Sequence, residues 1–182
     1  IESGLDNYGE NRAQDFLKKQ IALPGFKWHF IGHLQTNKVK LIVNKVCLIH
    51  GVDSLDLAKQ IDTQAKELGI TQKILIQLNL SGEVSKFGMP QTQLPHMLEG
   101  VQDLHNIRVC GLMTMAPFGA SEATLKNLFE KCNNLFIDIR GKKYHNIVME
   151  SLSMGMTSDF EAAIECGANI VRVGTGIFGN RN

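Results

Sequence analysis

Two hydrophobic periodicities alternate along the 182-residue chain. Short runs rich in β-branched residues, typical of strands, are followed by segments in which apolar residues recur every three or four positions, as on one face of a helix. The pattern predicts strands at 7–11, 27–34, 47–52, 73–80, 107–115, 147–153 and 169–173. It predicts helices at 12–20, 36–45, 54–69, 122–138 and 158–166, and a further helix within 91–100.

Repeated strand–helix units with short connections imply parallel strands. Eight such units close a barrel. Because the chain opens with IESG, which resembles the end of a helix, we expect one further strand–helix unit before Ile1. The predicted fold is therefore α/β, a (β/α)8 TIM barrel. It forms a single domain over residues 1–182 that is truncated at its N-terminus and lacks the first strand. An open doubly wound sheet is the alternative.

The strand faces favour the barrel over the open sheet. In the strand 73–80, one face carries Leu75, Gln77 and Asn79, so it becomes more polar toward the end of the strand. In the strand 147–153, the corresponding set is Met149, Ser151 and Ser153. A face that becomes polar at the carboxyl end suits a barrel with a binding site at that end.

Charge and cysteine usage exclude several classes of function. Nineteen basic and eighteen acidic residues give a formal charge of +1, so no overall field attracts nucleic acid or an anionic membrane. No apolar run is long enough to span a bilayer. The cysteines are widely spaced, without a CxxC pair, which predicts reduced thiols, no metal site and a cytoplasmic location. They are Cys47, Cys110, Cys132 and Cys166.

Two glycine-bearing loops, SMGMTSD (153–159) and GTGIFG (174–179), follow the last two predicted strands. Barrels often bind phosphate at this place, where backbone N–H groups converge on the anion and a Cβ would hold the chain away. Ser153 and Thr175 add hydroxyl groups. Ser158 begins a capping box, S-D-F-E, and is interpreted as a helix cap. The alternative is that the glycines only turn the chain.

Arg172 lies within the last predicted strand, on the same face as Ile170 and Gly174. If this face lines the barrel, the guanidinium needs a buried acceptor. The alternative is an outward side chain in a surface salt bridge. Asn11, Lys38 and Lys86 follow earlier strands, where helix capping or a solvated charge is the competing interpretation.

Six ordered blocks cover most of the chain: GENRAQ, WHFIGHLQTNK, SGEVSKFG, GLMTM, SLSMGMTSDFEAAI and VRVGTGIFG. In these blocks the chain resembles the pyridoxal phosphate homeostasis proteins, the YggS/PROSC family, whose fold is similar to the N-terminal barrel of alanine racemase. The resemblance implies pyridoxal 5′-phosphate (PLP) as cofactor. Ser153 and the backbone of Gly174 and Thr175 would contact its phosphate, Arg172 its pyridine nitrogen, and Asn11 would lie near the ring.

The resemblance also places the Schiff-base lysine upstream of Ile1, with Lys86 or Lys38 as substitutes if no such segment exists. It implies a PLP-binding carrier in vitamin B6 and amino-acid homeostasis. We expect no substantial turnover, because the second domain that carries a catalytic tyrosine in alanine racemases has no counterpart here. The expected partners are PLP and PLP-dependent apoenzymes, and the expected state is a monomer.

Two enzymatic alternatives remain from the sequence. One is a small PLP-dependent amino-acid racemase or decarboxylase using the same site. The other is a barrel enzyme acting on a sugar phosphate, for which Glu10 and His33 are the only candidate acid/base pair.

Overall fold

The computed structural model describes residues 4–83 and 86–179 and contains one eight-stranded sheet in which all paired strands are parallel. The strand order is β1-β2-β3-β4-β6-β7-β8, and the short β5 pairs with β4. The strands are β1 (Asn7–Glu10), β2 (Lys27–Phe30), β3 (Leu48–Val52), β4 (Gln72–Asn79), β5 (Met89–Pro90), β6 (Ile107–Thr114), β7 (Ile147–Met156) and β8 (Ile170–Arg172).

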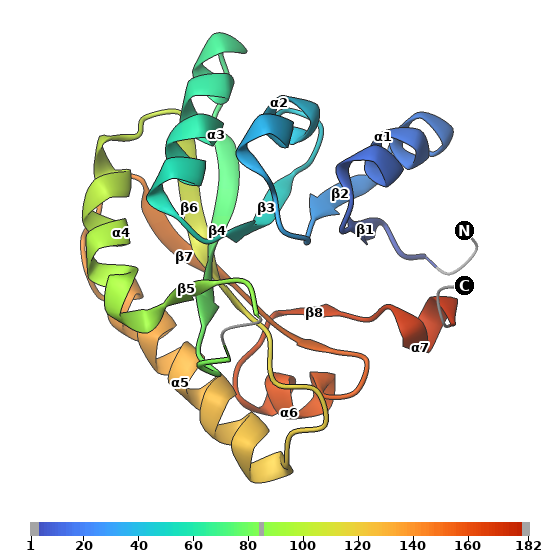
Figure 1. The fold of residues 1–182 in the computed structure, drawn as a ribbon, viewed down its shortest axis with the longest axis vertical. Coiled ribbons are helices and arrows are strands. Elements are labelled where there is room, and N and C mark those ends of the chain that lie inside the picture. The colour runs from blue at the N-terminus through green and yellow to red at the C-terminus, as the bar shows by residue number, and fades with distance from the viewer. Residues whose placement is uncertain (1–3, 84–85, 180–182) are drawn as a thin grey trace.

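The helices pack on the convex side of the curved sheet (Figure 1). They are α1 (Ala13–Ala22), α2 (Val39–Ile42), α3 (Leu55–Glu67), α4 (Leu94–Gly100), α5 (Glu122–Arg140) and α6 (Phe160–Glu165), whereas the short, exposed α7 (Thr175–Phe178) lies beyond the end of β8 (Figure 1). Apolar stripes of these helices and the outward strand residues form the main core, which includes the fully buried Phe16, Ile61 and Phe129. Within the described ranges, no helix is long and apolar enough to cross a membrane.

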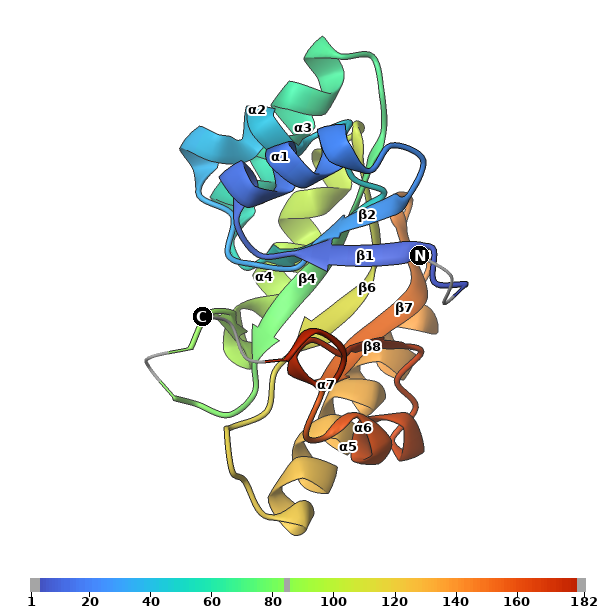
Figure 2. The same cartoon turned by 90° about the vertical axis from the view of Figure 1, so that its right-hand side faces the viewer.

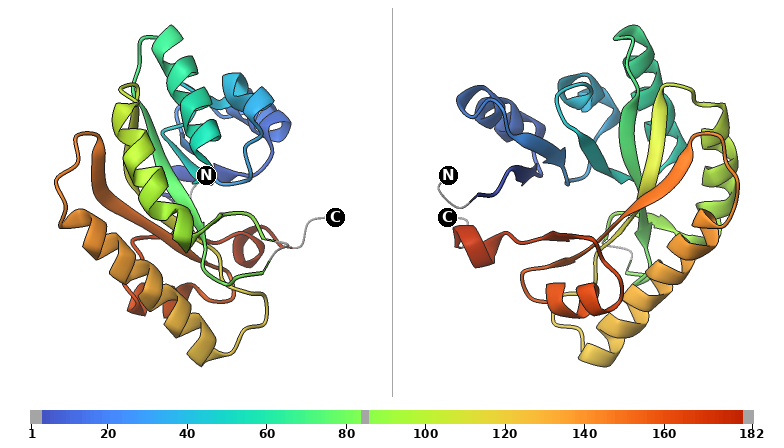
Figure 3. Two further views of the ribbon diagram at one scale, coloured as in Figure 1. Left: turned by 60° about the vertical axis from the view of Figure 1, so that its left-hand side comes forward. Right: turned by 180° about the vertical axis from the view of Figure 1, so that it is seen from behind.

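The sheet curls so that its two edge strands, β1 and β8, face each other on the side where both ends of the chain lie (Figures 1 and 3). In the ranges that the structure describes, β1 pairs with β2 and β8 pairs with β7, and no pairing joins β1 to β8. All the strand pairs are parallel, as a βα barrel requires, and Figure 2 shows the strands fanning out from β1 to β8. The predicted barrel-type α/β fold is confirmed, and the doubly wound alternative is wrong.

All seven predicted strands are present, but β2 is shorter than the predicted strand 27–34. Beyond Phe30, the chain passes very close to its neighbours, and a Cβ on Gly32 would lie 2.2 Å from the backbone oxygen of Asn11. The predicted helix 36–45 consists of a 3-10 turn (Thr36–Lys38) and the four-residue α2. The structure adds β5 and α7, which the sequence pattern did not predict.

A bulge in the sheet corrects the predicted faces of β7. The register of β6 with β7 shifts between the pairs Val109–Ile147 and Gly111–Ser151, so the alternation is broken. Alternation had predicted that Met149 shares the inward face with Ser153. In the structure, Met149 packs in the outer core, whereas Ser153 points inward. Gly111 is required at this bulge, because its φ is +155° and a Cβ there would lie 1.7 Å from the Ser151 oxygen.

The inside of the curved sheet is filled by a smaller apolar cluster. Leu48, Leu75, Cys110 and Met113 are buried in it, and Ile170 packs against them. This cluster comes from β3, β4 and β6, and Ile170 adds β8. Polar side chains of neighbouring strands lie on the same inner face, and they form the site described next.

Candidate functional site

Arg172 of β8 points to the inside of the sheet and is only 8% exposed. Its Nη1 donates to the Ser153 hydroxyl at 2.5 Å, and its Nη2 donates to the backbone oxygen of Thr114 at 2.9 Å. Burial lowers the pKa of Arg172 to about 10, so the guanidinium stays charged at neutral pH. The inward interpretation is thus confirmed, and the surface salt bridge is wrong.

A row of polar side chains continues from Ser153 across the interior. The Ser153 Oγ lies 3.0 Å from Nδ1 of His50 on β3, and His50 Nε2 lies 2.9 Å from Nδ1 of His29 on β2. His29 Nε2 lies 3.1 Å from Oδ1 of Asn7 on β1. Burial lowers the pKa of His29 and lowers the pKa of His50 further, so both imidazoles are neutral at pH 7.

The glycine loop after β8 meets the loop after β7 through Thr157. The backbone N–H groups of Gly174 and Gly176 both donate to the Thr157 hydroxyl, at 3.2 and 3.3 Å. A Cβ on Gly176 would lie 2.9 Å from Thr157 Cγ2, whereas one on Gly174 would meet nothing within 4 Å. The backbone donors are therefore collected around a hydroxyl, with open space beside Gly174.

Ser153 does not occupy this position. It pairs in register with Ile170, four residues before Gly174, and its side chain contacts Arg172 and His50. The sequence pattern predicted SMGMTSD (153–159) as one turn, and this boundary is wrong. In fact β7 continues to Met156, so Ser153 lies within a strand and Thr157 follows it.

The prediction of Ser158 as the cap of α6 is wrong by one residue. Asp159 is the N-cap, and its carboxylate turns back to accept from the backbone N–H of Met156 at 2.5 Å. Thr175 is exposed and begins α7. Asn11 is exposed at the end of β1, where its backbone N–H donates to the Glu10 carboxylate at 2.8 Å.

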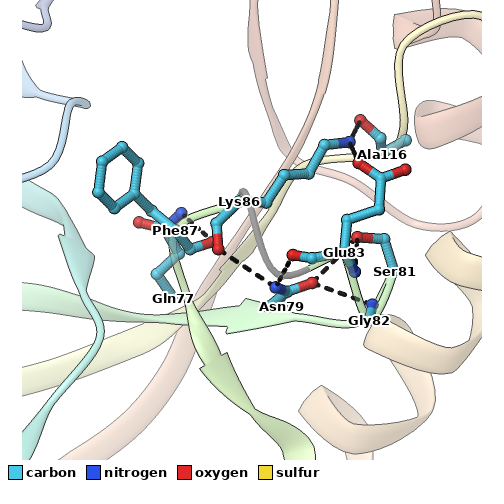
Figure 4. A network of polar contacts seen from close by, with 8 residues as sticks. All are labelled: Gln77, Asn79, Ser81, Gly82, Glu83, Lys86, Phe87 and Ala116. Carbon is cyan, nitrogen blue, oxygen red and sulfur yellow. Dashed lines mark hydrogen bonds and ion pairs between the residues drawn. The ribbon is translucent and has the colours of Figure 1, made fainter.

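Lys86 belongs to the loop that follows β4 (Figure 4). Its Nζ donates to the backbone oxygen of Ala116 at 2.8 Å and pairs with the Glu83 carboxylate at 3.2 Å. The Asn79 amide holds the same loop by donating to the backbone oxygens of Glu83 and Lys86. The ammonium thus links the loop after β4 to the loop after β6.

Lys38, the other substitute for the Schiff-base lysine, and the candidate acid/base pair Glu10 and His33 do not lie together. Lys38 is half-buried at the end of a 3-10 turn. Glu10 is buried and accepts a hydrogen bond from Lys19, while His33 faces Asp53 at 3.5 Å and stacks on the Phe87 ring. The two groups of the pair are therefore engaged by different partners. In the part of the chain that the structure covers, no cluster of three or more His, Cys, Asp or Glu could hold a metal.

Three site residues were missed by sequence reasoning: Thr157, His29 and His50. The two histidines carry a signal in hindsight, because each lies inside a predicted apolar strand. Their partners come from strands far away in the sequence, and periodicity alone does not reveal such pairs.

The chain thus belongs to the class of βα barrels, with a curved parallel sheet and an inward arginine on the last strand. The family model for the alanine racemase N-terminal domain matches residues 1–182. An alanine racemase of Clostridium difficile 630 superposes with a TM-score of 0.76 at 15% identity, covering 99% of this chain and 46% of that one, which shows a common fold.

Within this class, the chain belongs to the family of pyridoxal phosphate homeostasis proteins. It is 44% identical to the pyridoxal phosphate homeostasis protein of Aquifex aeolicus over 180 residues, which cover 98% of this chain and 78% of the relative. The corresponding protein of Pseudomonas aeruginosa is 37% identical, with 99% and 76% covered. PipY of Synechococcus elongatus, solved with PLP bound, superposes with a TM-score of 0.89 at 34% identity, covering 98% of this chain and 84% of PipY.

Proposed function

We propose that this protein is a PLP-binding carrier that serves vitamin B6 and amino-acid homeostasis. The observation that carries the proposal is the buried guanidinium of Arg172, held by Ser153 and Thr114 next to a loop of converging backbone N–H groups. The family relationship supports it, since PipY has been solved with PLP bound.

The donors match the two polar ends of the cofactor. A phosphate dianion is best held by several N–H and O–H donors. The backbone N–H groups of Gly174 and Gly176 and the Thr157 hydroxyl lie together, and we assign them to the phosphate with the neighbouring Thr175. The guanidinium of Arg172 can only donate, so it binds an unprotonated pyridine nitrogen and keeps the ring neutral. Asn11, at the end of β1, is assigned to the edge of the ring.

This assignment changes the predicted role of Ser153. Its hydroxyl is engaged by Arg172 and His50. We therefore assign Thr157, and not Ser153, to the phosphate, and we assign Ser153 to the positioning of Arg172.

When bound, PLP supplies an aldehyde that combines with amines and a ring that withdraws electrons. A neutral pyridine nitrogen withdraws electrons weakly, which suits storage and delivery better than amino-acid turnover. We propose that the protein has no substantial catalytic activity and that it hands PLP to PLP-dependent apoenzymes. We further propose that it acts as a monomer in the cytoplasm, where its four free cysteines remain reduced.

The edges of the sheet suggest where the covalent lysine lies. Unpaired strand edges that face each other are completed by a further strand in a closed barrel. We propose that residues 1–182 are one barrel domain whose closing strand, upstream of Ile1, pairs with β1 and β8 and carries the Schiff-base lysine. Lys86 is a weaker candidate, because its ammonium is already bound by Ala116 and Glu83.

Equilibrium dialysis with PLP tests the proposal. The wild type is expected to bind PLP, and Thr157→Val, which removes the hydroxyl and keeps the shape, should bind at least about tenfold more weakly. Ser158→Ala is the matched control, since this neighbouring hydroxyl is exposed. A wild type that does not bind PLP, or equal affinities of wild type and Thr157→Val, would contradict the assignment.

A separate assay tests the absence of turnover. Wild-type protein and PLP at near-stoichiometric concentrations are incubated with L-alanine, L-serine or L-lysine, and the products are separated on a chiral column. We expect neither D-amino acid nor amine above the level of free PLP. Product formation in proportion to protein would favour the racemase or decarboxylase alternative.

A further inference from the structure

A continuous hydrogen-bonded row joins the surface at β1 to the buried guanidinium on β8. It runs from Asp6 through Asn7, His29, His50 and Ser153 to Arg172, and five strands or their flanks contribute to it. The distances between neighbouring polar atoms in the row lie between 2.5 and 3.1 Å. In such a row, each proton can be donated in only a limited number of directions.

Both ends of the row have a fixed polarity. At the outer end, the Asn7 Nδ2 donates to the Asp6 carboxylate, so its Oδ1 is the atom that faces His29 and must accept. At the inner end, the Arg172 guanidinium can only donate to Ser153. Lys27 pairs with the Asp6 carboxylate at 2.7 Å and helps to keep it ionised.

The fixed ends determine every proton between them. Ser153 accepts from Arg172 and donates to His50 Nδ1, which must be unprotonated. His50 then carries its proton on Nε2 and donates to His29 Nδ1, and His29 donates from Nε2 to Asn7. This is the only direction in which two neutral histidines satisfy all four contacts.

From this geometry we propose that His29 and His50 are positioning residues, which hold the Ser153 hydroxyl in the orientation that accepts from Arg172. The proposal rests on the proposed function in one respect: the positioned guanidinium is the group that faces the PLP ring. The histidines touch neither the glycine loop nor Thr157 in any contact of the row, so they act through Ser153.

The row has a built-in sensitivity to pH. When the pair takes up one proton, the Nε2 proton of His50 passes to Nδ1 of His29 and the added proton resides on Nδ1 of His50, so that the positive charge lies on His29. Ser153 then receives N–H groups from both His50 and Arg172, and its own proton loses its acceptor. The other charged groups acting on the pair are cationic, Lys27 on His29 and Arg172 on His50, and both oppose this protonation.

The first test reads the protons directly in the protein without ligand. Nitrogen-15 chemical shifts of the imidazole rings at pH 7.5 should show both histidines neutral, with the proton on Nε2 in each. An imidazolium at either position, or a proton on Nδ1 of His50, would overturn the proposal.

The second test uses two variants of similar size. The Asn oxygen in His29→Asn can still accept from His50, whereas His29→Leu leaves the His50 N–H without its acceptor. We expect the Arg172 Nε–H signal to shift in His29→Leu and to stay close to wild type in His29→Asn. PLP affinity should fall about tenfold in His29→Leu and less than about threefold in His29→Asn. Equal behaviour of the two variants would overturn the proposal.

A pH profile separates positioning from a merely structural role. Wild-type affinity for PLP should decrease as the pH falls through the titration of the histidine pair, and this decrease should move to lower pH in His29→Asn. Because PLP ionises identically in both experiments, the difference belongs to the protein. Superimposable profiles would overturn the proposal. A wild type that does not bind PLP would refute the proposed function, while the imidazole and Arg172 signals would still decide whether the row holds the guanidinium.

Discussion

The imidazole Nδ1 of His50 lies 3.0 Å from the Ser153 hydroxyl, although 103 positions separate the two residues in the sequence. The contact joins β3 to β7 across the interior of the barrel, in surroundings where a charged imidazole is unfavourable. The effect of protonating His50 on the free energy of unfolding can therefore be measured as a function of pH.

We expect acid to destabilise the protein already below about pH 6.5. The pKa values of His29 and His50 are lowered by burial in the native state, so the unfolded chain, with ordinary values near 6.5, binds more protons. Their contribution is complete above this pH and is lost progressively as the pH falls toward the native values. Each histidine adds a slope of at most about 1.4 kcal/mol per pH unit.

Urea unfolding between pH 5 and 8 checks this expectation. His50→Gln should flatten the dependence of the unfolding free energy on pH, while His96→Gln, at an exposed position of α4, should leave it as in the wild type. A flat wild-type curve over this range would contradict the prediction.

Arg172→Lys should weaken PLP binding by about tenfold or more, because one ammonium cannot reproduce the planar fork that reaches Ser153, Thr114 and the ring together. Arg108→Lys is the matched control, since Arg108 pairs with Glu150 at the surface at 3.0 Å. Dialysis against PLP and thermal melting together distinguish lost binding from lost folding. Unchanged affinity in Arg172→Lys would argue against a guanidinium at the ring.

Gly111→Ala should destabilise the fold by about 3 kcal/mol or more, as expected for a severe backbone clash in a packed core. The added Cβ would lie 1.7 Å from the Ser151 oxygen, and the φ of +155° is unfavourable for alanine. Gly141→Ala provides the comparison, because Gly141 has φ −71° and its nearest atom is 3.6 Å from an added Cβ. That variant should be neutral or slightly more stable, and chemical denaturation measures both.

The cysteines should differ strongly in reactivity. Cys132 is fully buried, and burial raises its pKa to about 12, so at pH 7.5 almost no thiolate is present. Cys47 is exposed and should be alkylated first by iodoacetamide. Mass spectrometry over time gives the order, and labelling of Cys132 before Cys47 in the folded protein would contradict the structure.

Periodicity predicted the strands well because it depends on local alternation of apolar and polar residues. It failed where the backbone leaves the regular pattern. The bulge opposite Gly111 moved Met149 to the outer core, and the extension of β7 to Met156 placed Thr157, and not Ser153, beside the glycine loop. These features depend on contacts between strands, which no single segment specifies.

Within the site, the inward arginine could be predicted because a charged residue in a β-branched run is unusual and needs a buried acceptor. The histidines that complete its surroundings could not, since a buried histidine satisfied by the core gives the same sequence signal. Their function depends on the meeting of β1, β2, β3 and β7, which only the folded chain provides.

The outermost carboxylate of the polar row, on Asp6, is exposed and bound to the equally exposed Lys27. The charge on Asp6 at the surface is thus coupled to the buried histidines through hydrogen bonds alone, without backbone movement. Neutralising Lys27, for example by acetylation, would change the field at the first link, and a spectroscopic reporter attached there would sense the ionisation of the enclosed imidazoles.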